Sequence, residues 1–80
     1  MIVKELADLF IEDCQYFRIY DLANKDKIVF EDTIDKLPLK YKVKRVIMIE
    51  TIYEDVEFDG YLGIYIATEN EDEYWEKCND

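Results

Sequence analysis

The chain has 80 residues, of which 50% are hydrophobic and 15% aromatic, so it is long enough for one small domain with one modest core. Its seven Tyr, four Phe and one Trp argue against disorder, because segments that stay unfolded lack aromatic and β-branched residues. The net charge of −10 is segregated: residues 50–80 hold eleven acidic side chains and one base, whereas residues 1–49 hold nine of each sign. A surface charged in this way disfavours direct nucleic-acid binding and favours a basic partner.

Residues 3–13 predict the first helix. Ile2, Leu6, Leu9 and Phe10 recur at helical spacing on one face, and charged residues occupy the opposite face. A helix with this pattern buries its apolar face. We therefore expect one N-terminal helix packed against the core.

A β-hairpin is predicted to follow this helix. Apolar residues alternate from Tyr16 to Tyr20, which is typical of a strand, and Ile28–Phe30 resumes that pattern. The segment Asp21–Lys27 between them contains Asp and Asn residues that favour turns. The next segment, Thr33–Leu37, is expected to form a short helical turn that ends before Pro38.

The longest strand candidate is Val43–Val56. Both of its faces are largely apolar, and a strand that is buried on both faces lies in the middle of a sheet. We therefore expect this segment to be the central strand.

The Asp59–Gly60 pair predicts a second hairpin, and two registers compete there. A two-residue turn would place carboxylates on the buried face, whereas a shift of one residue exchanges the two faces. The shifted register, with Gly60 in a left-handed bulge position, keeps more apolar side chains on the buried face than the two-residue turn does, so we favour it. It pairs Val56 with Leu62, Glu54 with Ile64, and Ile52 with Ile66.

Together these elements predict an α+β domain over residues 1–68. Its sheet is small, four-stranded and mainly antiparallel, with the N-terminal helix packed across it. Residues 69–80 form an acidic C-terminal segment that is either a short helix or an extended arm. Its two aromatic residues, Tyr74 and Trp75, are expected either to dock on this domain or to bind a partner.

The residues needed for common catalytic or metal chemistry are scarce. The chain contains no His and no Ser, and its two Cys are far apart in the sequence. The sequence therefore predicts neither a Ser or Cys nucleophile with a His base nor a Cys/His zinc site. Glycine occurs only at positions 60 and 63, which excludes a glycine-rich phosphate loop. Carboxylates are so abundant that no single pair is informative. We expect no enzyme activity, no cofactor and no metal.

The basic stretch of residues 36–45, KLPLKYKVKR, contains half of the ten bases. Lysines with an interleaved tyrosine can grip phosphates. Lysines that flank a strand also protect an exposed edge from pairing, and we favour this second interpretation because the whole chain is acidic.

The acidic C-terminal part is the candidate partner-binding surface. Alternate residues on a strand are about 6.6 Å apart, so a row of carboxylates there can imitate a phosphate track. Lys and Arg side chains that normally meet phosphate would accept such a surface, and neighbouring aromatic residues would supply anchors. The candidate residues are Glu54, Asp55, Glu57, Asp59, Tyr61, Tyr65, Glu69, Glu71, Asp72, Glu73, Tyr74, Trp75 and Glu76.

The first ten residues, MIVKELADLF, become acidic by position 5 and contain no continuous apolar run, so they predict neither a signal peptide nor a membrane span. We therefore expect a cytoplasmic protein. In a reducing compartment Cys14 and Cys78 are expected to be free thiols rather than a bridge.

A helix followed by the segments FRIYD, IVFED, DKLPLKY and VIMIE resembles small proteins encoded by phages and mobile elements. Several anti-CRISPR inhibitors are similar: short, acidic, rich in tyrosine and without catalytic motifs. The resemblance implies a stoichiometric inhibitor of a nucleic-acid-binding phage-defence nuclease, such as a CRISPR nuclease, and transfers no site residues. The alternative is a small protein-protein interaction module or homodimer whose charge serves solubility only.

Overall fold

The computed structural model describes residues 1–12, 15–52 and 61–79. This part of the chain contains three α-helices, four strands and two short 3-10 helices (η). In chain order the elements are α1 (Val3–Phe10), β1 (Phe17–Asp21), η1 (Leu22–Asn24), β2 (Lys27–Asp32), η2 (Ile34–Lys36), α2 (Leu39–Lys42), β3 (Met48–Ile52), β4 (Tyr61–Ile66) and α3 (Glu71–Asn79).

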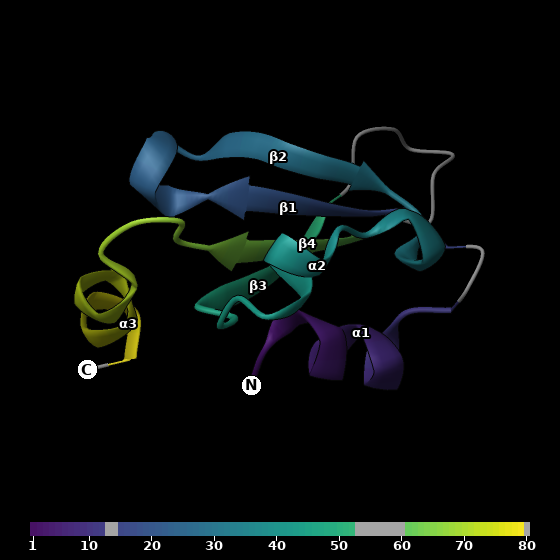
Figure 1. Ribbon diagram of the computed structural model, residues 1–80, viewed down its shortest axis with the longest axis horizontal. Coiled ribbons are helices and arrows are strands. Elements are labelled where there is room, and N and C mark those ends of the chain that lie inside the picture. Colours follow the sequence, from purple (N-terminus) through teal and green to yellow (C-terminus); the bar gives the residue numbers. More distant parts are fainter. Residues whose placement is uncertain (13–14, 53–60, 80) are drawn as a thin grey trace.

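The four strands form one sheet in the order β2-β1-β4-β3 (Figure 1). Strands β1 and β2 pair antiparallel, as do β3 and β4, and the two hairpins meet through the parallel pair β1 and β4. Parallel neighbours require a crossover connection, which is supplied here by the chain that includes η2 and α2. The α+β class and the four-stranded, mainly antiparallel sheet with its N-terminal helix are therefore confirmed, whereas the parallel centre was not foreseen.

The core lies on one face of the sheet. Phe17 and Ile19 of β1 and Ile64 and Ile66 of β4 are fully buried, together with residues of α1 and Leu37. The rings of Phe17 and Phe30 pack with their centroids 5.3 Å apart. Period-two alternation in β1 and β4 thus places one face of each central strand against the helices.

Helix α1 is shorter than expected and turned about its axis. It ends at Phe10 rather than residue 13, and it buries Val3, Leu6 and Ala7 while Leu9 and Phe10 are exposed. The predicted core face is therefore wrong for those last two residues. Two overlapping faces share Leu6, and hydrophobic periodicity alone cannot choose between them; packing on the sheet selects the one that contains the small Ala7.

The central position predicted for Val43–Val56 is wrong. Strand β3 covers only Met48–Ile52 and lies at the end of the strand order, so the central strands are β1 and β4. The register is also different, because Ile52 pairs with Tyr61 and not with Ile66. The predicted pairs of Val56 and Glu54 lie outside the described residues. The apolar character of both faces of β3 is real, but it belongs to an edge strand.

The buried carboxylate of Asp21 joins the end of β1 to the chain that follows β4. Its Oδ1 accepts hydrogen bonds from the backbone N–H of Ala23 at 3.1 Å and of Thr68 at 3.0 Å, and its Oδ2 accepts one from the Thr68 hydroxyl at 2.6 Å. Buried carboxylates are tolerated when they are hydrogen-bonded in this way. The turn residue Asp21 is therefore also a contact between the two hairpins.

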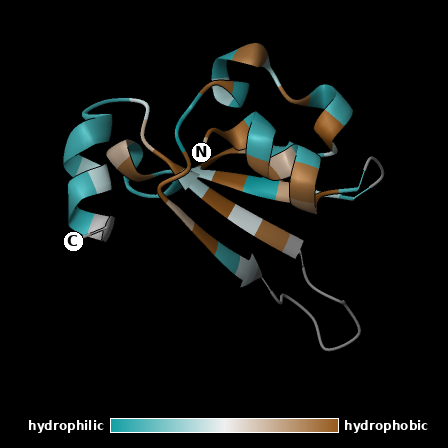
Figure 2. Cartoon of the chain, turned by 90° about the horizontal axis from the view of Figure 1, so that it is seen from below, coloured by the Kyte–Doolittle hydropathy of each residue, from teal (hydrophilic) through white to brown (hydrophobic). Residues whose placement is uncertain are grey.

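Several shorter elements agree with the sequence. The helical turn expected over Thr33–Leu37 is η2, and the acidic C-terminal segment forms helix α3. Helix α2, in the basic stretch, was not expected. Figure 2 shows the hydrophilic α3 at one end of the molecule, apart from α1 and α2, with β3 along the margin of the sheet.

Candidate interaction surfaces

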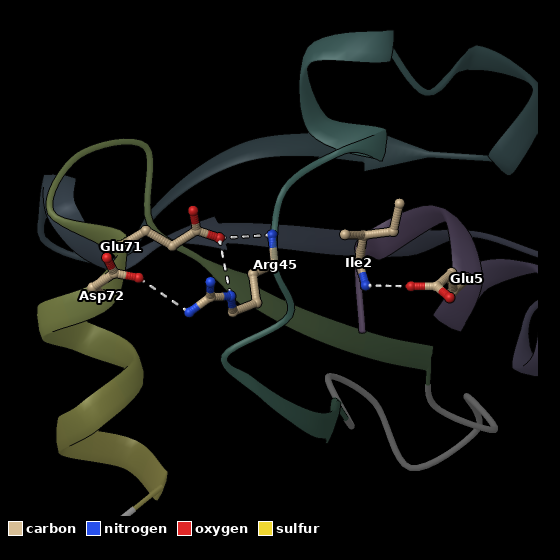
Figure 3. Close-up of polar contacts among 5 residues, drawn as sticks. All are labelled: Ile2, Glu5, Arg45, Glu71 and Asp72. Atoms are coloured by element: carbon tan, nitrogen blue, oxygen red, sulfur yellow. Dashed lines mark hydrogen bonds and ion pairs between the residues drawn. The ribbon is translucent and has the colours of Figure 1, made fainter.

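Helix α3 is anchored to the rest of the chain by Arg45, as Figure 3 shows. Glu71 Oε1 accepts a hydrogen bond from the backbone N–H of Arg45 at 2.8 Å and lies 3.9 Å from its Nε. Asp72 Oδ1 accepts a hydrogen bond from the Arg45 Nη1 at 3.2 Å. Both acids lie in the first turn of α3, where negative charge also interacts favourably with the helix dipole.

The same arginine holds two more segments. Its guanidinium carbon lies 5.1 Å from the ring centroid of Trp75, within cation–π range, and its backbone forms an antiparallel bridge with Ile2. Arg45 therefore connects the N-terminal segment to the C-terminal helix. The sequence interpretation assigned Arg45 only to a basic stretch. Arg45 and Glu71 are 26 residues apart, and neither helical periodicity nor a hairpin brings residues at that separation together, so the sequence pattern could not predict this contact.

Docking through Glu71 and Trp75 turns the opposite face of α3 outward. Residues three and four apart share a helix face, so Glu76 shares a face with both Asp72 and Glu73. Glu73 lies on the side away from Trp75, whereas Asp72 also contacts Arg45. The side chains of Asp72, Glu73 and Glu76 and of the preceding Glu69 are exposed, and we call these four residues the acidic stripe. Lys77 is the only base of α3: its ammonium lies 3.5 Å from Glu73 and 5.7 Å from the Tyr74 ring centroid. Asp72 and Glu73 are thus paired with Arg45 and Lys77 through exposed contacts, which water and salt screen.

The face of the sheet opposite the core carries a row of side chains from all four strands. Tyr20 and Tyr65 are direct neighbours across the parallel pair, and their rings stack with centroids 4.8 Å apart. Ile28 of β2 pairs with Tyr20, and Met48 of β3 pairs with Tyr65. We call Ile28, Tyr20, Tyr65 and Met48 the tyrosine row. Ile28 and Met48 remain 44% and 42% exposed, so the row presents apolar surface.

The two tyrosine hydroxyls are held by charged neighbours. The Arg18 Nη1 donates to the Tyr20 hydroxyl at 2.9 Å, and the same guanidinium donates from Nε to Glu31 at 2.8 Å. The Tyr65 hydroxyl donates to Glu50 Oε1 at 2.7 Å. This hydrogen bond to the carboxylate, followed by burial, raises the pKa of Tyr65 to about 12.

The structure describes nine of the thirteen predicted partner-binding residues. Glu71 and Trp75 face the body of the chain, Tyr65 belongs to the tyrosine row, and Tyr61 begins β4 opposite Ile52. The residues Glu69, Asp72, Glu73 and Glu76 lie together as the acidic stripe, next to Tyr74. The residues Glu54, Asp55, Glu57 and Asp59 lie outside the described residues.

Further apolar residues are exposed, two of which, Leu9 and Phe10, the sequence had placed in the core. Leu9 and Phe10 of α1 are 68% and 66% exposed, and Leu39 and Val43, at α2, are also exposed. Large exposed apolar residues on two helices are the kind of surface that proteins use for association. An apolar face of α1 that includes Val3 and Ala7, rather than Leu9 and Phe10, would have predicted that Leu9 and Phe10 are exposed.

No family model matches the chain, and no curated protein or solved structure shows significant similarity to it. Among the described residues, no helix is long and apolar enough to cross a membrane. Within the same part of the chain, no group of three or more Cys, Asp or Glu side chains is arranged to hold a metal ion.

Proposed function

We propose that this protein is a stoichiometric inhibitor that binds the basic nucleic-acid site of another protein by imitating phosphate. The first target class to test is a phage-defence nuclease of the CRISPR type, in keeping with the resemblance of the sequence to small acidic inhibitors. The protein would then act in the cytoplasm as a binder rather than as an enzyme. It would use no cofactor.

The acidic stripe is the observation that carries this proposal. Its four carboxylates are exposed on α3 and just before it, while Arg45 contacts Glu71, Asp72 and Trp75 and so fixes the orientation of the helix. Arginine and lysine side chains that bind phosphate also accept carboxylates. A pre-oriented row of negative charge raises the rate of association with a positive cleft.

The test uses a variant that neutralises the acidic stripe and leaves Glu71 unchanged: Glu69→Gln, Asp72→Asn, Glu73→Gln and Glu76→Gln. Capture of CRISPR nucleases, with and without guide RNA, identifies the target, and competition with target DNA follows. At low salt we expect the variant to associate about tenfold more slowly, with a flatter salt dependence. An association rate equal to that of the parent protein would contradict the proposal.

A matched control separates location from net charge. The variant with Asp8→Asn, Glu12→Gln, Asp26→Asn and Asp35→Asn removes the same number of exposed carboxylates from the other part of the chain. This control should associate nearly as fast as the parent protein. Equal slowing of both variants would mean that overall charge matters and the stripe does not.

The tyrosine row supports a second candidate function, a small interaction module or homodimer. Ile28 and Met48 flank the stacked rings of Tyr20 and Tyr65 and stay more than two-fifths exposed. In this case Tyr65→Ala should weaken binding more than neutralisation of the stripe, because interface energy concentrates in buried aromatic anchors. A sedimentation coefficient that rises with protein concentration would favour the homodimer.

A further inference from the structure

Strand β3 lies at an edge of the sheet. It pairs with β4 from Met48 to Ile52 in unbroken register, and the described residues contain no strand on its other side. The chain just before it does have partners, because Val3 N–H donates to Lys44 O and Val46 N–H to Met1 O, each at 2.9 Å. The backbone groups that point away from β4 are therefore a template for another strand.

The two edges of the sheet differ. Strand β2 begins with Lys27 and ends with Glu31 and Asp32, and its register with β1 is interrupted at Ile19 and Tyr20. Charges and irregular pairing are the features by which proteins protect a sheet edge. Strand β3 has no lysine, no proline and no break in register.

The side chains of β3 are also suited to pairing. Met48 and Ile49, which point to opposite faces of the sheet, are 42% and 49% exposed. Ile49 lies directly opposite Ile64, which is fully buried, so the exposure of Ile49 arises on the outer side of the strand. A strand added there would cover apolar surface on both faces.

We propose that β3 binds an extended, basic segment of a partner protein by strand addition, as a second contact beside the acidic stripe. The partner is basic because the only charged residue of the strand is Glu50 and the chain as a whole carries −10. Opposite charges on neighbouring strands stabilise pairing, and like charges destabilise it. A second copy of this chain would bring its own −10 to the same edge. This inference rests on the proposed basic partner, but its test does not need the nuclease.

The experiment uses an acetylated eight-residue peptide of alternating valine and lysine. Hydrogen exchange of the backbone amides is followed by NMR with and without the peptide. When the free peptide exceeds its dissociation constant tenfold, the outward-facing amides of Met48–Ile52 should exchange about tenfold more slowly. The same measurement is made on the variant that lacks the acidic stripe, and in that variant the amides of α3 serve as the reference for β3.

Two control peptides separate strand addition from simple charge attraction. A peptide of the same sequence with every residue N-methylated keeps its charge but has no backbone N–H donor on either edge, and it should not protect β3. A peptide with glutamate in place of lysine should not bind. The Glu50→Gln variant should bind the lysine peptide more weakly and with less dependence on salt.

The outcomes are distinct from those of the inhibitor test. Protection of β3 that survives in the stripe variant supports the edge site, even if no nuclease is captured. Equal protection by the N-methylated peptide, or loss of all binding in the stripe variant, would overturn it. If, in the absence of peptide, protection of β3 increases with protein concentration, the edge pairs with a second copy of this chain. That result would also overturn the proposal.

Discussion

Two aspartates show how differently this chain uses its carboxylates. Asp21, at the end of β1, is 3% exposed and accepts three hydrogen bonds from Ala23 and Thr68. The side chain of Asp72, on α3, is 88% exposed and accepts one hydrogen bond from Arg45. One carboxylate holds two hairpins together, and the other faces solvent.

This difference separates structural charge from charge that is free to meet a partner. Buried donors that lose an acceptor cost the full desolvation penalty, whereas exposed ion pairs contribute little because water and salt screen them. Among the described residues, the buried carboxylate of Asp21 is therefore needed for the fold. We expect that the carboxylates of the acidic stripe can be removed with little effect on folding, which makes them suitable for mutation in binding tests.

Asp21→Ala should have the largest effect. It leaves the Ala23 N–H and both Thr68 donors without their acceptor, so we expect the free energy of unfolding to fall by about 3 kcal/mol or more. Urea denaturation followed by circular dichroism measures this change. Asp72→Ala is the matched control and should change stability by less than about 0.5 kcal/mol. Equal losses in the two variants would refute the distinction between them.

Arg45→Ala should have an intermediate effect. It removes the ion pairs with Glu71 and Asp72 and the contact with the Trp75 ring, and we expect a loss of about 1–2 kcal/mol. Trp75 fluorescence should shift to longer wavelength as the indole becomes more exposed to water. Arg45→Lys keeps the charge and should lose less. Unchanged fluorescence in Arg45→Ala would show that α3 docks without this residue.

The hydroxyl of Tyr65 should make stability depend on pH in the alkaline range. Its pKa rises from the ordinary value of 10.0 to about 12 in the folded protein, so the neutral form is favoured there. The contribution of this group is complete below pH 10 and is lost as the pH rises from about 10 to about 12. Tyr65→Phe should flatten the fall in unfolding free energy over this interval. Parallel curves for the two proteins would exclude the Glu50 hydrogen bond as its cause.

Neutralising the acidic stripe should have the smallest effect on folding. The loss of Asp72 and Glu73 from the first turn of α3 removes a favourable interaction with the helix dipole, but it also relieves repulsion among neighbouring carboxylates. We expect the unfolding free energy to change by less than about 0.5 kcal/mol. A larger loss by urea denaturation would mean that the stripe serves the fold, and binding defects of that variant could not be assigned to the partner contact.

The sequence by itself determined the elements whose pattern is local. The α+β class, the strand near Tyr16–Tyr20, the turn after Asp21 and the helical turn before Pro38 follow from periodicity and turn chemistry within a few residues. The segregation of charge toward the C-terminal part also follows directly from the order of residues. For the acidic stripe, the sequence supplied the residue types and their neighbourhood.

Only the tertiary structure decided the features that join distant segments. The parallel pairing of β1 with β4 placed β3 at the edge, because two apolar hairpins compete for the centre of a sheet and pairing across distant parts of the chain selects between them. The contact of Arg45 with Glu71 decided which carboxylates of α3 face inward. Interactions across 26 residues leave no periodic trace, since loop closure and packing, rather than spacing along the chain, bring such groups together.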